Sequence, residues 1–267
     1  KPLTERTAMR ILISNDDGID APGLKALREI ALALSDDVWV VAPETNHSGA
    51  GHSLSLREPL RMRQIDDREF AVRGTPTDCV IMGVRHVMYE KRPDLILSGV
   101  NMGQNLAEDV TYSGTIAAAF EGTLVGVRSI ALSQALGIGG PPGAKRGPNW
   151  ETCITHGPGI VRSLLDLKWS KNTLMNVNFP DCAPDEVRGI QITRQGRRDQ
   201  EVLKIEERHD TWGTPYYWLG FRSRRSNAEE GTDLRAVYDG FVSVTPLSLN
   251  LTADDMLEPT RLAFDAG

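Results

Sequence analysis

Cysteine is scarce in this chain, and the spacing of the few cysteines excludes two common kinds of scaffold. The 267 residues include three, Cys79, Cys153 and Cys182, an odd number with no CxxC pair. Disulfide-stapled secreted domains and structural zinc sites both need paired or closely spaced cysteines. We therefore expect three reduced thiols with structural roles in a cytoplasmic protein.

Long apolar runs and an excess of basic residues are also missing. No stretch approaches the roughly 18 apolar residues that span a bilayer, so we expect no membrane contact. Residues 1–8 are polar, and we expect an expression remnant or a loose extension there rather than a secretory signal. The formal net charge of −6 excludes an overall positive field that would attract a nucleic acid polymer. A small anionic substrate would need local neutralisation by a metal ion, a helix terminus or a few arginines.

Short apolar runs alternate with helical patterns from residue 9 to residue 134. Leu24, Leu27, Ala31 and Leu34, for example, share one helical face. The apolar runs are continuous, which is typical of parallel strands covered by helices on both sides. The sequence predicts a doubly wound α/β core, with strands at 9–14, 38–42, 94–98 and 129–133, two shorter strands within 54–73, and helices at 24–34, 77–88 and 115–124.

The second half of the chain has a different texture. Residues 139–149 are rich in proline and glycine and predict a surface loop; a helix at 154–167 is followed by strands at 173–179 and 241–244. Residues 188–225 place apolar ends around a strongly charged middle, which favours a projecting hairpin. Such an arm cannot bury its own apolar side chains, so a partner subunit is expected to cover it.

Three polar loops follow strands of the predicted sheet. They span residues 15–18, 44–53 and 101–115. In an open parallel sheet, ligands bind beyond the carboxyl ends of the strands, where loops leave for the helices. We therefore expect these loops to meet at one edge of the sheet and to form the functional site.

The adjacent carboxylates Asp16 and Asp17 are the first candidates in that site. Two neighbouring carboxylates at a strand end repel each other unless a cation or hydrogen-bond donors compensate, and a hard divalent ion with oxygen ligands supplies that compensation. Gly18 lets the backbone turn away at once. The alternative is that one Asp caps the following helix while the other is merely solvated.

Ser113, Gly114 and Thr115 open a helix of small residues. A helix N-terminus offers free N–H groups and partial positive charge, and Gly114 would let a phosphate approach the backbone. A plain Ser cap without a ligand is the alternative. Asn101 and Asn105 could ligate a metal ion, donate to phosphate or stabilise a turn.

The remaining polar candidates have two interpretations each. Ser48 is a loop hydroxyl that could be a ligand or have no role. His47 and His52 could act as acid–base groups or phosphate donors, or lie exposed without function. We expect the arginines of one charged stretch to lie on a solvated face: Arg194, Arg197 and Arg198.

Five stretches of the sequence together resemble the SurE family, the survival-protein-E acid phosphatases, which are 5′/3′-nucleotidases. The stretches are ILISNDDGIDAPG, VVAPETNHSGAGHSLSL, GTPTDCV, PDLILSGVNMGQNLAEDVTYSGTIAAAFEG and GFVSVTPLSLNLT, in order across residues 9–252. NDDG combined with SGVNxGxN and YSGT is highly specific, unlike any one of these motifs alone.

The resemblance implies a Rossmann-like three-layer α/β core with a mostly parallel sheet, a C-terminal β-hairpin arm and a swapped C-terminal segment. We divide the chain into the extension at 1–8, the catalytic core at 9–187, the oligomerisation arm at 188–225 and, at 226–267, a strand and helix segment exchanged between subunits. The expected assembly is a homodimer or a homotetramer.

The resemblance also implies a metal site and a phosphate pocket. One divalent ion per subunit, Mg²⁺, Mn²⁺ or similar, would be held by Asp16, Asp17, Ser48 and Asn101. The phosphate pocket would be formed by Asn105, Ser113, Gly114 and Thr115. The implied reaction is hydrolysis of nucleoside monophosphates, or of other small phosphate esters, by a metal-activated water, with Asp16 or Asp17 as the catalytic carboxylate that moves a proton.

Two other functions stay open from the residues. Asp16 could be the covalent nucleophile of a haloacid-dehalogenase-like phosphatase, although those enzymes carry a DxD spacing and this chain has adjacent Asp. The chain could also be a nucleotide- or sugar-binding module without turnover. The absence of G-x-G-x-x-G after the first strand weakens a dinucleotide version of that module.

Overall fold

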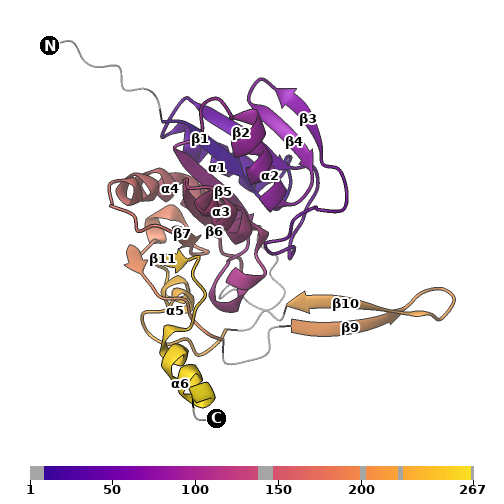
Figure 1. Ribbon diagram of the computed structural model, residues 1–267, viewed down its shortest axis with the longest axis vertical. Coiled ribbons are helices and arrows are strands. Elements are labelled where there is room, and N and C mark those ends of the chain that lie inside the picture. Colours follow the sequence, from indigo (N-terminus) through magenta and orange to yellow (C-terminus); the bar gives the residue numbers. More distant parts are fainter. Residues whose placement is uncertain (1–8, 138–146, 199–202, 222–224, 266–267) are drawn as a thin grey trace.

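A nine-stranded sheet forms the centre of the computed structural model within the residues that the structure describes, which are 9–137, 147–198, 203–221 and 225–265. Its strand order is β3-β4-β2-β1-β5-β6-β7-β11-β8 (Figure 1). The strands are β1 (Ile11–Ser14), β2 (Val38–Pro43), β3 (Arg61–Asp66), β4 (Glu69–Arg73), β5 (Leu95–Met102), β6 (Arg128–Gln134), β7 (Thr173–Phe179), β8 (Ile190–Ile192) and β11 (Val242–Ser248).

Most neighbouring strands of this sheet run parallel. Parallel pairing joins β4, β2, β1, β5, β6 and β7, while β3 pairs antiparallel with β4 and β11 pairs antiparallel with β7. The predicted three-layer α/β fold with a mostly parallel sheet is thereby confirmed. β8 and β11 belong to the sheet, so it continues beyond residue 187, where we expected the core to end.

Helices cover both faces of the sheet, which explains the continuous apolar runs of its strands. Ile11 and Ile13 pack in one core cluster with α1 (Pro22–Leu32) and α4 (Trp150–Leu165). Leu12 points to the opposite face and packs with α2 (Pro76–Met82) and α3 (Gly114–Leu124). A strand with apolar side chains on both faces is stable only where helices cover both faces of its sheet, because both sets of side chains are then removed from water.

The predicted elements differ from the observed ones mainly at their ends. The helix expected at 77–88 is α2 followed by the π-helical turn η1 (Gly83–Val87), and the first strand expected within 54–73 begins only at Arg61. The last strand, expected at 241–244, extends to Ser248. Pro246 is tolerated within it because β8 pairs only with the part of β11 before this residue, so the strand is one-sided there.

A separate hairpin projects from the body of the molecule (Figure 1). It consists of β9 (Leu203–His209) and β10 (Pro215–Phe221), which pair antiparallel and form a sheet of their own. Trp212, Tyr217, Trp218 and Leu219 are exposed on it. An apolar surface of this kind on a two-stranded hairpin is typical of a protein–protein contact.

Short elements complete the fold; a helix was expected within residues 226–267 without bounds, and the two 3₁₀ turns were not expected. These elements are the 3₁₀ turns η2 (Ala107–Thr111) and η3 (Pro184–Glu186) and the helices α5 (Asp233–Tyr238) and α6 (Asp254–Asp265). No residue of α6 is buried, and Met256, Leu257, Leu262 and Phe264 are exposed on it. The predictions for residues 1–8 and for most of the 139–149 loop fall outside the described residues. None of the described helices is both long and apolar enough to cross a membrane.

Candidate functional site

The loop after β1 and the loop after β2 lie against each other at one edge of the sheet. The backbone N–H of His47 donates to the carbonyl of Asp16 over 2.8 Å, and the side-chain amide of Asn46 donates to Oδ1 of Asp17 over 3.1 Å. Gly18 permits this approach, since its φ of +106° favours glycine and a Cβ would lie 3.3 Å from the carbonyl carbon of Thr45.

Asp16 joins the first loop to the start of α3. Its side chain is 4% exposed, and Oδ1 accepts a hydrogen bond of 2.6 Å from the hydroxyl of Thr115. A Cβ added at Gly114 would lie 2.7 Å from Cβ of Asp16, so glycine is what lets the helix start at this distance from the carboxylate. Burial raises the pKa of Asp16 to about 6; the Thr115 hydrogen bond lowers the pKa and the charge of Asp17 raises it.

Asp17 joins the first loop to the end of β5, where the polar segment of residues 101–115 begins. Its Oδ2 accepts from the backbone N–H of Met102 over 3.2 Å. Burial raises the pKa of Asp17, against the hydrogen bonds from Met102 and Asn46, which lower it. No basic side chain of the described residues contributes to the pKa shift of either Asp16 or Asp17. The predicted meeting of the three loops is observed, with a carboxylate pair at its centre that lacks a compensating side-chain cation in the described part of the chain.

Two residues with neutral oxygen donors, Asn101 and Ser48, lie in the segments that contact this pair, and a hard divalent cation accepts such donors. The amide N–H of Asn101 donates to the carbonyl of Gly103 over 2.8 Å, which leaves its Oδ1 as an oxygen donor. Ser48 is exposed, and its backbone N–H donates to Asn46, the residue that contacts Asp17. The described residues contain no group of three or more His, Cys, Asp and Glu that could hold a metal, so a cation here would need neutral oxygen ligands as well.

The start of α3 offers backbone N–H groups rather than hydroxyls. The Ser113 side chain accepts from the N–H of Ile116 over 3.1 Å, so Ser113 is the N-cap, and the Thr115 hydroxyl is engaged by Asp16. The N–H groups of Gly114 and Thr115 lie in the first turn, where an α-helix has no internal acceptors for them. These two N–H groups and the helix dipole can bind an anion next to Asp16.

Asn105 is anchored in the fold by its own contacts. Its backbone N–H donates to Oδ1 of Asn178 over 2.8 Å, and its side-chain amide donates to Ser133 over 2.9 Å. The side-chain amide of Asn176 donates to the carbonyl of Asn105 over 2.9 Å. The sequence reasoning missed Ser133, Asn176 and Asn178. The available signal was the two asparagines on one face of an otherwise apolar strand, because buried asparagine side chains need hydrogen-bond partners.

The histidines have contacts that do not include Asp16 or Asp17 side chains. Nε2 of His52 lies 3.2 Å from Oε2 of Glu121, and its ring packs beside Phe120. His47 is half-buried and contacts Asp16 through its backbone. Neither contact assigns an acid–base role to a histidine.

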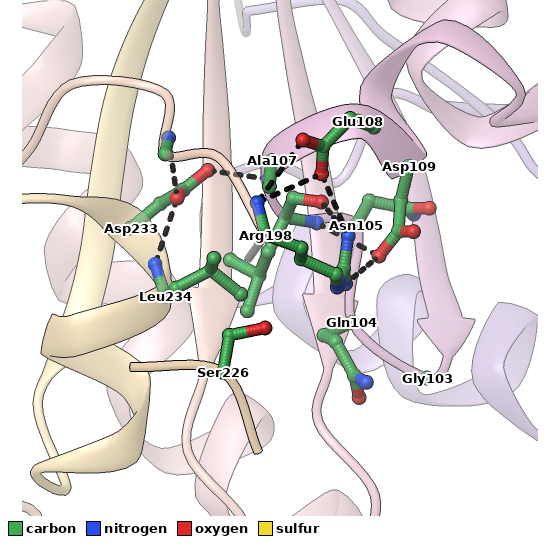
Figure 2. Close-up of polar contacts among 12 residues, drawn as sticks. Gly103, Gln104, Asn105, Ala107, Glu108, Asp109, Arg198, Ser226, Asp233 and Leu234 are labelled. Carbon is green, nitrogen blue, oxygen red and sulfur yellow. Dashed lines mark hydrogen bonds and ion pairs between the residues drawn. The ribbon is translucent and has the colours of Figure 1, made fainter. Parts of the chain in front are cut away.

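The solvated-face interpretation of the arginines holds for Arg194 and is wrong for Arg198. The Arg194 side chain is 65% exposed and pairs with Glu229. The Arg198 side chain is 9% exposed and pairs with both Glu108 and Asp109 (Figure 2). Sequence composition could not separate the two, because the partners of Arg198 lie about 90 positions earlier in the chain.

Comparisons with known proteins agree with the resemblance in the motifs. The family model described as "Survival protein SurE" matches residues 11–202. The chain is 56% identical to 5′-nucleotidase SurE of Methylorubrum extorquens (strain PA1), over 97% of this chain and 100% of the relative. It is 59% identical to 5′-nucleotidase SurE of Bradyrhizobium sp. (strain ORS 278), over 91% of this chain and 95% of the relative. The crystal structure of SurE protein from Aquifex aeolicus superposes with a TM-score of 0.80 at 42% identity, over 96% of this chain and 100% of that chain.

Proposed function

The chain belongs to the SurE family and is a nucleotidase, and we propose that it hydrolyses nucleoside 5′- and 3′-monophosphates with a divalent metal ion at Asp16 and Asp17. The observation that carries the proposal is the contact of a buried carboxylate with a helix start. Oδ1 of Asp16 lies 2.6 Å from the hydroxyl of Thr115, and α3 begins against the same side chain. A cation bound at the carboxylates and an anion bound at the helix would therefore be neighbours.

The proposed metal ligands are the two carboxylates and two neutral oxygens, in the side chains of Asp16, Asp17, Ser48 and Asn101. The buried Asp16 beside the half-buried Asp17, with no basic side chain of the described residues contributing to their pKa shifts, supports this assignment, because holding adjacent carboxylates out of water is costly without a cation. All four are oxygen donors, the type that Mg²⁺ and Mn²⁺ prefer. When bound, the ion supplies Lewis-acid polarisation of the phosphoryl group and lowers the pKa of a water.

The residues of the chain itself bind and orient the phosphate. The N–H groups of Gly114 and Thr115 would hold its oxygens at the positive end of the α3 dipole, and they stabilise the charge that builds on these oxygens during in-line attack. Thr115 fixes one oxygen of the Asp16 carboxylate and leaves the other for the reaction site. Asp16 or Asp17 takes the proton of the attacking water or assists the leaving group.

The same proposal includes the assembly and the cellular location. The exposed aromatic side chains of the hairpin β9–β10 and the exposed apolar residues of α6 support a homo-oligomer, a dimer or a tetramer. The cysteines Cys79, Cys153 and Cys182 are unpaired, which supports a cytoplasmic location.

Turnover with and without metal tests the proposed function. AMP and p-nitrophenyl phosphate should both be hydrolysed in the presence of Mn²⁺, EDTA should abolish the activity, and fresh Mn²⁺ should restore it. Asp16→Asn should fold and lose about 10²- to 10³-fold in kcat, the loss typical of a group that supports charge in the transition state. Turnover that is unaffected by EDTA, or a near wild-type kcat in Asp16→Asn, would exclude the metal site.

A further inference from the structure

A buried arginine connects the turn before α3 to the segment that leads into the hairpin. Nη2 of Arg198 donates to Oδ2 of Asp109 over 2.6 Å (Figure 2). Nη1 donates to the carbonyl of Leu106 over 3.2 Å. Nη1 also lies 3.3 Å from Oε2 of Glu108, and the backbone N–H of Arg198 donates to Oε1 of the same residue over 3.0 Å. One guanidinium thus bridges the beginning and the middle of the turn formed by η2.

The turn that Arg198 contacts determines where α3 begins. The carbonyl of Asp109 accepts from the backbone N–H groups of Tyr112 and Ser113, both over 3.0 Å. Ser113 is the N-cap of α3 and directly precedes the two N–H groups proposed to bind phosphate. A shift of Asp109 would therefore move the cap of the helix and the anion site with it.

The conformation of this turn depends on residues outside it. Ala107 has a φ of +52°, a region that residues with a Cβ disfavour. Its N–H donates to Asp233 over 2.9 Å, and its carbonyl accepts from the side-chain amide of Gln195 over 2.9 Å. Asp233 also accepts from the N–H of Gly196 over 2.8 Å, which fixes the segment that carries Arg198.

The positive charge of Arg198 compensates the two carboxylates of the turn, Glu108 and Asp109. Burial raises the pKa of Asp109, and the Arg198 guanidinium acts in the opposite direction by favouring the charged carboxylate. Among the described residues, Arg198 is the basic side chain that forms ion pairs with Glu108 and Asp109. Its removal would leave two adjacent carboxylates, one of them mostly buried, without a counter-charge, and such a pair moves apart or toward water.

We propose that Arg198 is a positioning residue for phosphate binding, which holds the 106–113 turn so that the N-terminus of α3 faces the phosphate group. Its guanidinium contacts are made within the protein, so it acts through the turn and does not touch the substrate. The inference rests on the proposed function and adds a residue that lies outside its ligand set.

The test compares Arg198→Ala with Arg194→Ala, a matched control in the same segment whose ion pair is exposed. The measurements are kcat and KM for AMP with Mn²⁺ and the inhibition constant of inorganic phosphate. Arg198→Ala should raise KM and the phosphate inhibition constant together by about tenfold or more, because substrate and product share the phosphate site, and it should also lower kcat, because the same N–H groups stabilise charge in the transition state. Arg194→Ala should match the wild type. Methylguanidinium should lower the KM of Arg198→Ala and leave the wild-type KM unchanged, because it refills the ion-pair site.

A KM and a phosphate inhibition constant close to those of the wild type in Arg198→Ala would overturn the proposal, and so would a fall in kcat alone. If Arg198→Ala does not fold, Arg198→Lys decides, since an ammonium keeps the charge but cannot bridge Leu106 and Asp109 with a planar fork. Its KM and phosphate inhibition constant should then rise together above those of the wild type, and values equal to the wild type would overturn the proposal. A wild-type protein without AMP turnover would refute the proposed function instead. Weaker calorimetric binding of inorganic phosphate by Arg198→Ala than by the wild type would still support the role of Arg198 in that case, and equal binding would refute it.

Discussion

The contact between Gly114 and Asp16 yields a prediction whose magnitude can be worked from the structure. In Gly114→Ala, the new Cβ would lie 2.7 Å from Cβ of Asp16 and 3.2 Å from its Cγ. Non-bonded carbons rest at about 3.5–4.0 Å, so the helix start or the carboxylate must move by about 1 Å. A misplacement of about 1 Å at a reacting centre costs on the order of 10²-fold in rate.

We therefore expect Gly114→Ala to lower kcat/KM for AMP by about 10²-fold. The effect on stability should be small, because overpacking costs about 1–3 kcal/mol and alanine is favoured over glycine in a helix by about 0.5–1 kcal/mol. The assay is steady-state hydrolysis of AMP with Mn²⁺, combined with urea unfolding of the same preparations.

Gly159→Ala is the matched control for this substitution. Gly159 lies in α4, and a Cβ there meets nothing within 4 Å. The control should keep the wild-type kcat/KM and gain about 0.5–1 kcal/mol in the free energy of unfolding. A kcat/KM of Gly114→Ala within about threefold of the wild type would refute the reasoning, because the predicted loss is about 10²-fold.

Three more predictions follow from the same contacts. In EDTA, the free energy of unfolding should fall as pH rises from about 4 to 6, because burial raises the pKa of Asp16 from 3.8 to about 6 and the folded state then binds more protons than the unfolded state. Asp16→Asn should show a shallower fall, since the raised pKa of Asp17 remains, and should exceed the wild type by about 3 kcal/mol above pH 6. Urea titrations with equal pH slopes would contradict this. Asn178→Leu leaves the N–H of Asn105 without its acceptor, which should lower the free energy of urea unfolding by about 1–3 kcal/mol and also lower kcat/KM. Full activity of this variant would show that the Asn105 loop keeps its conformation without Asn178. Trp218→Ser should reduce the mass measured by light scattering, and an unchanged mass would exclude Trp218 from the subunit contact.

The core of the fold could be predicted from the sequence because its signals are local. The run Ile11–Ser14 is fully buried, and a short run of this kind before a turn is typical of a strand covered on both faces. The loops with Asp16, Asp17 and Asn101 could be predicted to meet because parallel strands present their carboxyl ends at one edge. Hydrogen bonds now connect the three loops, as that rule requires.

The network behind the site could not be predicted, because its contacts join distant parts of the chain. Asn105 meets Asn178 across 73 positions, and Arg198 meets Asp109 across 89. No periodicity of the sequence indicates such pairs, so the sequence does not distinguish Arg198 from the other arginines of the same charged stretch. The helix expected within residues 226–267 could not be given bounds, because Pro259 interrupts the pattern of α6 and the helix packs on no core of the described subunit.

Asp16 and Asp17 as metal ligands are the central claim, and anomalous scattering from crystals grown with Mn²⁺ tests it most directly. The account predicts one strong anomalous peak per subunit between the carboxylates of Asp16 and Asp17, with Ser48 and Asn101 among its ligands, and no peak there in crystals of Asp16→Asn. A peak elsewhere in the chain, or none in crystals of an enzyme that Mn²⁺ activates, would contradict it.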